Sequence, residues 1–250
     1  MEHYWSRADS SDREFIGHSS MAAGDERESR AFIEELRRRD WLFAREPARL
    51  RTHTRVMRAV HCGSGNGRVS QNVLLTAFDE VDLVDPSANS LATSRRNIEA
   101  SASDVRRVGR LEKMYNVPLQ EFTPETGRGY DVIWLQEVTG YLLDADLVSL
   151  FVRLRSALTL PSLSRDADGN GGGVAGSTSG GGLLVVKESV HFLNGPDVQP
   201  WFDEQIMVLA RTRTHFHKIF KSAGLKLLLE RNTNNSLSEG YLPIWFFVLR

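Results

Sequence analysis

The segment "VMRAVHCGSGNGR", residues Val56 to Arg68, sets the organisation of this chain. A short apolar run breaks into a loop with glycines at positions 63, 65 and 67, and a helix-compatible segment begins at Arg68. Glycines at alternate positions let a strand turn sharply into a helix, and they leave no side chain between the backbone and a ligand in the turn. The segment predicts a strand, a ligand-binding turn and a helix, although an ordinary loop can have the same composition.

A second apolar run, Val81 to Val84, ends in Asp85, roughly 20 positions beyond Gly63. An acidic residue at the end of the second strand is where nucleoside-binding α/β sheets place the acceptor for the ribose hydroxyls. The glycine turn and Asp85 together predict a nucleoside site.

Composition narrows the class of protein. The 250 residues are 41% hydrophobic and 25% charged, which predicts one globular core. A net charge of −1 gives no general attraction to nucleic acid or anionic membranes, and no run has membrane-spanning length. The single cysteine, Cys62, excludes an internal disulfide and a cysteine-cluster metal site. Because the N-terminus also lacks the apolar segment of a signal peptide, we expect a soluble protein of the cytoplasm or nucleus without a bound metal.

Residues 1–55 are expected to form an arm and a helix that pack on the main domain, residues 56–250. Tyr4 and Trp5 are costly to leave in water, so the arm should fold back on the body. A helix is predicted from Asp25 to Phe43, with Phe32, Ile33 and Leu36 on its buried side.

From Val56 onward, apolar runs alternate with helical patterns. Strands are predicted at Val56–His61, Val81–Asp85, Lys113–Val117, Tyr130–Leu135 and Leu183–Ser189, and helices at Arg68–Phe78, Ser87–Ala100, Asp144–Leu158, with Asp144 as its cap, and Ile206–Ser222. The runs "LKLLLE" and "IWFFVLR" close the chain as an antiparallel hairpin, and the Gly/Ser-rich segment 161–182 is expected to be a flexible insertion. The pattern predicts an α/β fold, a mainly parallel seven-stranded sheet with helices on both faces.

Several of these segments resemble a known family. The chain is similar to the class I S-adenosylmethionine-dependent methyltransferases, which have a Rossmann-like fold. More narrowly, it resembles the protein α-N-terminal methyltransferases, which methylate the α-amine of proteins that begin Xaa-Pro-Lys. The matching segments are "CGSGNGR" (62–68), "EVDLVDPS" (80–87), "LQEFTPE" (119–125), "YDVIWLQEVTGYLLDADL" (130–147), "GGLLVVKES" (181–189) and "SAGLKLLLE" (222–230).

The resemblance implies S-adenosylmethionine as the cofactor and assigns residues to its parts. The implied cofactor-binding residues are Gly63, Arg68, Asp85, Pro86, Ser87, Leu119, Gln120 and Gln136. Arg68 would pair with the cofactor carboxylate through its planar fork, and Asp85 would accept hydrogen bonds from the ribose hydroxyls. Gln120 would pair with an adenine edge, and Gln136 would lie beside the methionine part.

The substrate side departs from the family's pattern. The family's tryptophan, histidine and asparagine are replaced here by Glu137, Tyr141 and Ser189. The family's acidic residue aligns near Ile206, although Asp203 and Glu204 lie just before it. We therefore predict Tyr141, Asp203 and Glu204 as catalytic candidates, with Trp5, Glu137 and Ser189 binding the substrate. An unperturbed tyrosine, with a pKa of about 10, would orient an amine better than it would deprotonate one.

The leading hypothesis is a methyltransferase acting on protein N-terminal α-amines with an altered substrate pocket. Its partner would be a protein or peptide N-terminus, not nucleic acid or a membrane, and the protein would be a monomer. Two alternatives stay open. One is a cofactor-binding regulator with weak or no catalysis, since the family's histidine and asparagine are both replaced. The other is a small-molecule methyltransferase of the same fold.

Overall fold

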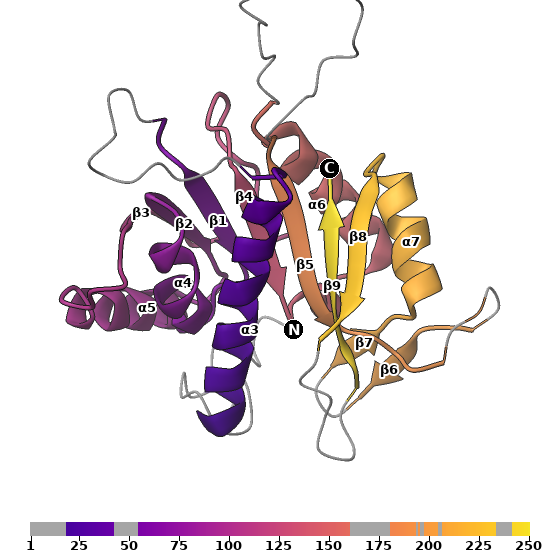
Figure 1. Ribbon diagram of the computed structural model, residues 1–250. Helices are drawn as coiled ribbons and strands as arrows, with labels where there is room; N and C mark the ends of the chain where they lie inside the picture. Colours follow the sequence, from indigo (N-terminus) through magenta and orange to yellow (C-terminus); the bar gives the residue numbers. More distant parts are fainter. Residues whose placement is uncertain are drawn as a thin grey trace, which may run out of the picture.

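The computed structural model describes residues 19–42, 55–160, 181–193, 195, 198–204, 207–233 and 242–250. Its main sheet contains β1 Arg58–Cys62, β2 Glu80–Val84, β3 Arg110–Tyr115, β4 Val132–Gln136, β5 Leu183–Ser189, β8 Leu227–Asn232 and β9 Ile244–Leu249. The strand order is β3-β2-β1-β4-β5-β9-β8, with β1 to β5 parallel and β9 antiparallel to both of its neighbours (Figure 1). The predicted seven-stranded sheet and its terminal hairpin are confirmed.

Helices cover both faces of this sheet (Figure 1). They are α3 Ser19–Arg38, α4 Arg68–Asn72, α5 Ala88–Ala100, α6 Asp144–Ser156 and α7 Arg213–Ser222, with 3-10 turns η2 Leu74–Thr76 and η3 Thr139–Tyr141. Successive residues of each central strand enter opposite hydrophobic clusters, so that Ile133 joins one cluster and Trp134 the other. A parallel strand with helices on both sides buries every side chain, which explains the unbroken apolar runs in the sequence.

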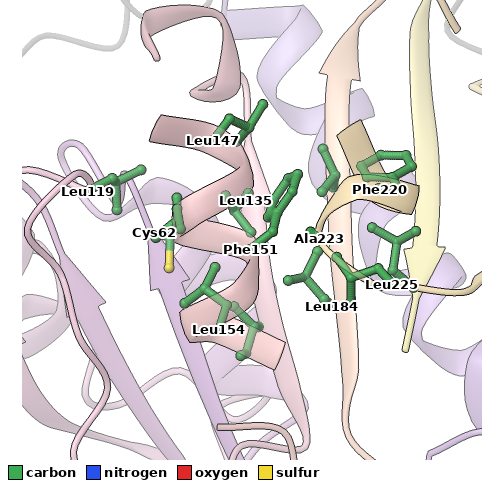
Figure 2. Close-up of a cluster of buried hydrophobic side chains, with 14 of the residues drawn as sticks. Cys62, Leu119, Leu135, Leu147, Phe151, Leu154, Leu184, Phe220, Ala223 and Leu225 are labelled. Carbon is green, nitrogen blue, oxygen red and sulfur yellow. The ribbon is translucent and has the colours of Figure 1, made fainter. Parts of the chain in front are cut away.

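One cluster joins α6 and α7 to the sheet. Figure 2 shows Phe151 and Leu154 of α6 beside Leu184 of β5, with Phe220 of α7 next to them. The rings of Phe151 and Phe220 lie 5.7 Å apart between centroids. These contacts fix the two helices on one face.

The opposite cluster contains α3, α4, η2 and α5. Phe32 of α3 stacks on Phe246 of β9 with 4.0 Å between ring centroids, and the Arg231 guanidinium lies 4.7 Å from the Phe32 ring centre. Phe32, Ile33 and Leu36 are buried as predicted. The helix begins at Ser19 and ends at Arg38, whereas the sequence pattern gave Asp25 to Phe43. The remaining arm, including Trp5, and most of the predicted insertion lie outside the described residues.

Two predictions after β4 are wrong. The predicted helix Ile206–Ser222 is a helix only from Arg213, because Val208–Ala210 forms β7 and pairs with β6, Trp201–Asp203. Asp144 does not cap α6, since Leu143 occupies the cap position. The Asp144 carboxylate instead accepts hydrogen bonds from Arg211 Nε at 2.9 Å and pairs with His215 Nε2 at 2.5 Å. Asp144 therefore forms a tertiary ion pair with Arg211 and His215 in place of the predicted helix cap.

The first helix after the glycine turn is also shorter than predicted. The range 68–78 contains α4 and then the 3-10 turn η2.

In the part of the chain that the structure describes, every helix is too short or too polar to span a bilayer.

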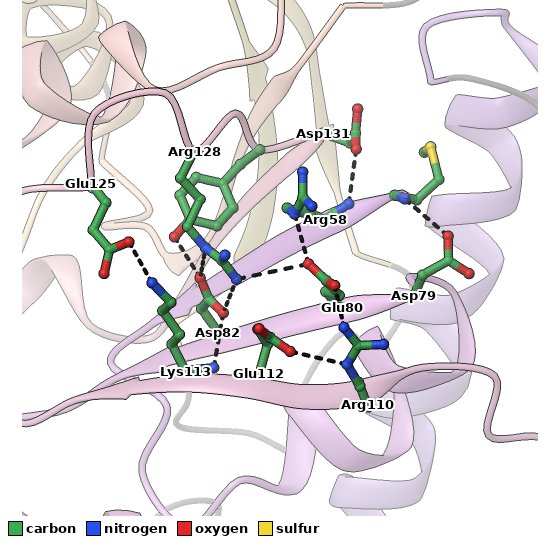
Figure 3. Close-up of polar contacts among 12 residues, drawn as sticks. Arg58, Asp79, Glu80, Asp82, Arg110, Glu112, Lys113, Glu125, Arg128 and Asp131 are labelled. Atoms are coloured by element: carbon green, nitrogen blue, oxygen red, sulfur yellow. Dashed lines mark hydrogen bonds and ion pairs between the residues drawn. The ribbon is translucent and has the colours of Figure 1, made fainter. Parts of the chain in front are cut away.

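A buried carboxylate joins β2 to the neighbouring loop (Figure 3). Asp82 is fully buried and accepts hydrogen bonds from Arg128 Nε at 2.6 Å, Arg128 Nη2 at 2.8 Å and the Tyr130 hydroxyl at 2.6 Å. The backbone N–H of Lys113 adds a fourth bond at 3.1 Å. Because a buried charge is tolerated only when it is paired and hydrogen-bonded, Arg128 is expected to be essential to this network.

We predict that Arg128→Met lowers the free energy of unfolding by about 3–5 kcal/mol, because it leaves the Asp82 charge buried without its cation. Urea unfolding at pH 7 measures the change. Arg110→Met is the matched control: its side chain is 66% exposed where it pairs with Glu80, so its loss should cost no more than about 1 kcal/mol. Equal effects of the two substitutions would contradict the assigned role of Arg128.

Candidate active site

The glycine turn joins β1 to α4 at the carboxyl end of the parallel strands. Gly63, Gly65 and Gly67 have φ angles of 76°, 54° and 84°, in the left-handed region that favours glycine. A Cβ atom on Gly63 would lie 2.4 Å from Val138 Cγ2, and one on Gly67 would lie 2.8 Å from Ser94 Cβ. The predicted turn is therefore present, and its backbone approaches its neighbours as only glycine permits.

Asp85 follows β2 and is tied to this turn. Its Oδ2 accepts from the Gly65 N–H at 2.8 Å, and its Oδ1 accepts from the Ser87 N–H at 2.9 Å. Burial raises the pKa of the Asp85 carboxyl, and these two hydrogen bonds oppose that effect. Ser87 caps α5 by accepting from the Ser90 N–H at 3.2 Å, and Pro86 is exposed between them. Each Asp85 oxygen has a second lone pair, so this arrangement fits a ligand that carries two hydroxyls.

The predicted adenine-side residues lie in the turn after β3. Leu119 is buried in the core, and Gln120 is exposed. Arg153 of α6 holds this turn by donating to the Leu119 carbonyl at 3.0 Å and to the Gln120 carbonyl at 2.8 Å. Sequence reasoning missed Arg153, because nothing in a helical pattern shows which distant carbonyl a surface arginine will reach.

The other end of the site contains a residue that sequence reasoning also missed. Asp25 of α3 accepts from Arg68 Nη2 at 2.8 Å and from Gln136 Nε2 at 3.0 Å. Arg68 Nη1 also donates to Glu26 at 3.2 Å, while Gln136 Oε1 accepts from Trp134 Nε1 at 3.2 Å. Arg68 and Gln136, which the family resemblance assigns to the cofactor's methionine part, therefore meet at a carboxylate from α3.

Glu137 and Ser189 come together where β4 and β5 end. The Ser189 hydroxyl donates to Glu137 Oε2 at 2.9 Å, and Glu137 has a positive φ of 51°. Few residues other than glycine adopt this backbone conformation, and it is often found at functional sites. The family resemblance assigned both residues to the substrate side, and the structure makes them a hydrogen-bonded pair.

Glu188 is the buried neighbour of this pair. Its Oε2 accepts from the Val138 N–H at 3.1 Å, the Thr139 N–H at 2.8 Å and the Thr139 hydroxyl at 2.7 Å. Burial raises the pKa of Glu188, and these donors oppose that effect without cancelling it. The Glu137 side chain is exposed at the end of β4, yet desolvation by the surrounding protein and then the charge of Glu188 raise the pKa of Glu137 to about 8. The pKa values of both neighbouring carboxyls, Glu137 and Glu188, are thus above their ordinary value.

A buried arginine, Arg211, holds the turn that carries Tyr141. Tyr141 is half-buried in η3, and the fully buried Arg211 donates to the Thr139 carbonyl at 2.8 Å and to the Leu142 carbonyl at 2.6 Å. The β6–β7 hairpin packs against this turn, since a Cβ on Gly140 would lie 2.6 Å from Val208 Cγ1.

The remaining acidic candidates lie on that hairpin. Asp203 is the last residue of β6, and Glu204 is exposed in the turn that follows. The structure therefore places the hairpin of Asp203 and Glu204 beside the turn of Tyr141. Within the described ranges, no group of three or more His, Cys, Asp and Glu side chains is arranged to hold a metal ion.

Comparison with known proteins finds similar sequences. Residues 1–162 match the model of a family described as AdoMet-dependent proline di-methyltransferase, where AdoMet is S-adenosylmethionine. An alpha N-terminal protein methyltransferase 1 from Arabidopsis thaliana is 36% identical over 169 residues, covering 68% of this chain and 51% of that protein. A human N-terminal Xaa-Pro-Lys N-methyltransferase 1 is 30% identical over 192 residues, covering 77% of this chain and 71% of that protein. The chain spans about half the length of the plant relatives it matches.

Solved structures support the fold. A SAM-dependent methyltransferase from Leishmania major matches with a TM-score of 0.73 at 20% identity, covering 100% of this chain and 81% of that one. The glycopeptide N-methyltransferase MtfA complexed with S-adenosylmethionine matches with a TM-score of 0.53 at 12% identity, covering 79% of this chain and 89% of that one.

We predict that Gly63→Ala destabilises the protein more than Gly127→Ala does. Both glycines have a left-handed φ, 76° and 79°, so each alanine should cost roughly 1–2 kcal/mol. Only the Gly63 position is crowded by Val138, whereas nothing lies within 4 Å of a Cβ on Gly127, so Gly63→Ala should cost about 1–3 kcal/mol more. Urea unfolding of the two variants measures the difference. Equal losses of unfolding free energy in the two variants would show that the contact with Val138 does not restrict the residue at position 63.

Proposed function

Because this chain belongs to the family of AdoMet-dependent proline di-methyltransferases, we propose that it transfers a methyl group from S-adenosylmethionine to the N-terminal α-amine of a protein or peptide. The observation that carries the proposal is the pair formed by Glu137 and Ser189 at the ends of β4 and β5. The residue after Glu137, Val138, packs against the glycine turn. We propose that the carboxylate form of Glu137 serves as the proton acceptor next to the proposed nucleoside site.

The chain's own residues fit the cofactor. Asp85 offers two carboxylate oxygens at the carboxyl end of β2, and Gly63 lets the adjoining turn pack closely against Val138. In parallel α/β sheets, ligands lie outside these strand ends, where the strand order reverses between β1 and β4. When bound there, S-adenosylmethionine supplies a methyl group on a positively charged sulfur, so the protein's task is to bring a neutral amine to it.

A neutral amine requires the loss of one proton. The reference pKa of an α-amine is about 7.7–8.0, so roughly a tenth of it is neutral at pH 7. The carboxylate form of Glu137 can accept the amine proton, because its pKa of about 8 is close to that of the amine. The Ser189 hydroxyl orients Glu137 by donating to Oε2, and the Tyr141 hydroxyl is proposed to orient the amine.

The substrate is proposed to be a peptide because two of the relatives are named for protein N-termini and for the Xaa-Pro-Lys sequence. Asp203 and Glu204 add carboxylates on the hairpin beside η3. These carboxylates suit a substrate with a cationic side chain near its N-terminus.

We predict transfer of labelled methyl from S-adenosylmethionine to synthetic Xaa-Pro-Lys peptides with a free N-terminus. The matched control is the same peptide with an acetylated N-terminus, which has no amine lone pair at the acceptor position and should stay unlabelled. Mass spectrometry locates the label and counts the methyl groups. Bound cofactor without transfer to any α-amine would favour a regulatory protein, and labelling of small amines alone would favour a small-molecule methyltransferase; either result contradicts the proposal.

We predict that Glu137→Gln lowers kcat by about 10²–10⁴, the usual contribution of a positioned acid or base. In the wild-type protein kcat should rise with pH and level off above about pH 8, as Glu137 loses its proton. Glu137→Gln should keep only the rise that comes from the substrate α-amine, whose own pKa is about 7.7–8.0.

A stability measurement tests the same carboxyl without turnover. A glutamate with an ordinary pKa of 4.5 when unfolded and a raised pKa when folded destabilises the fold as pH increases between those two values. Glu137→Gln should therefore gain in Tm relative to the wild type between pH 5 and pH 9. Glu99→Gln, at an exposed position on α5, is the control and should show no such gain. A pH-independent difference for Glu137→Gln would contradict the assigned protonation.

A further inference from the structure

Asp25 lies where three elements of the proposed cofactor site meet. Its carboxylate bonds to Arg68 of α4, to Gln136 of β4 and to Lys187 of β5. Gln136 Nε2 is 3.0 Å from each Asp25 oxygen, so the amide faces the whole carboxylate. Lys187 Nζ also lies 3.0 Å from the Ser29 hydroxyl one helical turn further along α3. A helix that precedes the sheet in sequence thus reaches the ends of its central strands.

These groups form a fixed charge arrangement. Lys187 is 1% exposed and the Arg68 side chain 10% exposed, and Asp25 lies between the two cations. Burial raises the pKa of the Asp25 carboxyl, but the Lys187 and Arg68 charges outweigh this effect and hold it below its ordinary value. Asp25 is therefore ionised, and ionised acceptors bind donors more strongly than neutral ones.

The strand order gives the position of these residues across the site. Asp85, at the end of β2, marks the ribose side of the site. Arg68 and Gln136, beyond β1 and at the end of β4, lie on the far side of the glycine turn. A nucleoside that carries an amino acid, laid across these strand ends with its sugar at Asp85, directs the amino acid toward Arg68 and Gln136.

Arg68 can serve both Asp25 and a ligand. A guanidinium carries five N–H donors in a planar fork, and Arg68 directs bonds from Nη1 and Nη2 to α3. A second carboxylate can share the fork. The contact with Asp25 restricts the rotation of the long Arg68 and Gln136 side chains, which would otherwise lose that freedom when a ligand binds.

We propose that Asp25 is a positioning residue for the amino-acid end of the cofactor, holding the Arg68 guanidinium and the Gln136 amide in the orientation that binds it. This inference rests on the proposed function. It makes α3 part of the cofactor site, and it predicts that Asp25 matters only for ligands that carry the amino-acid end.

Isothermal calorimetry with two ligands tests the inference. S-adenosylhomocysteine carries the amino-acid end, and 5′-methylthioadenosine has the same nucleoside and sulfur without it. Asp25→Asn should weaken S-adenosylhomocysteine binding roughly 10- to 100-fold, the effect expected when two long side chains must be ordered on binding. Binding of 5′-methylthioadenosine should change less than about twofold, because its contacts lie on the Asp85 side.

Two further variants separate positioning from stability. Glu28→Gln removes a carboxylate from the same helix, 3.7 Å from Lys187, and should leave both affinities unchanged. Because Asp25→Asn deprives buried Lys187 of a counter-charge and can unfold the protein, the double variant Asp25→Asn/Lys187→Met removes both charges. The double variant should show the same loss for S-adenosylhomocysteine alone.

Each remaining outcome has a definite meaning. Equal weakening of both ligands would show that Asp25 only supports the fold and would overturn the inference. Unchanged or tighter binding of S-adenosylhomocysteine by the variants would also overturn it, tighter binding because Asp25 would then compete with the ligand. If folded wild-type protein bound neither ligand, the proposed function would fail with it.

Discussion

The close approach of the Gly63 backbone to Val138 is the constraint on which the rest of the site depends. A single additional carbon at position 63 would overlap the Val138 side chain, so the turn after β1 and the residues after β4 can pack only with glycine there. Val138 is also held through its N–H, which donates to the buried Glu188. One contact therefore aligns the nucleoside side of the site with the side where an acceptor amine would lie.

On the side of the site where an acceptor amine would lie, buried polar groups are held by hydrogen bonds to the backbone and side chains around them. Glu188 accepts three hydrogen bonds from Val138 and Thr139, and Arg211 binds the carbonyls of Thr139 and Leu142. Glu137 stands out against this background, with a positive φ and a second carboxylate nearby. Local strain of this kind persists only where the surrounding structure enforces it, and it is concentrated at functional sites.

Much of the fold was predictable from local patterns, because parallel strands buried on both faces leave unbroken apolar runs. Strand β5 has the predicted bounds, Leu183–Ser189, and the glycine turn with Asp85 stands where the sequence placed it. Strands β6 and β7 were missed because they are three residues long and half exposed, so neither alternation nor burial marks them.

Side-chain partners from distant segments were the least predictable part. Asp144 looks like a helix cap until Arg211, far along the chain, takes its carboxylate. Asp25 belongs to a solvated helical pattern in the sequence, and only the folded chain brings it to Gln136. The raised pKa of Glu137 likewise depends on desolvation by the folded chain and then on the charge of Glu188 across the strand ends. Sequence identified the residue types of the site, whereas their protonation and orientation depend on tertiary contacts.

The packing of α3 on β9 has a consequence for biosynthesis. Phe32 stacks on Phe246, so a helix that is made before β1 finds its partner in β9, far along the chain. Contacts between residues so remote in sequence form late and slowly during folding. A nascent chain can thus assemble β1 to β5 before β9 has been made, which leaves the apolar side of α3 exposed until β9 is available.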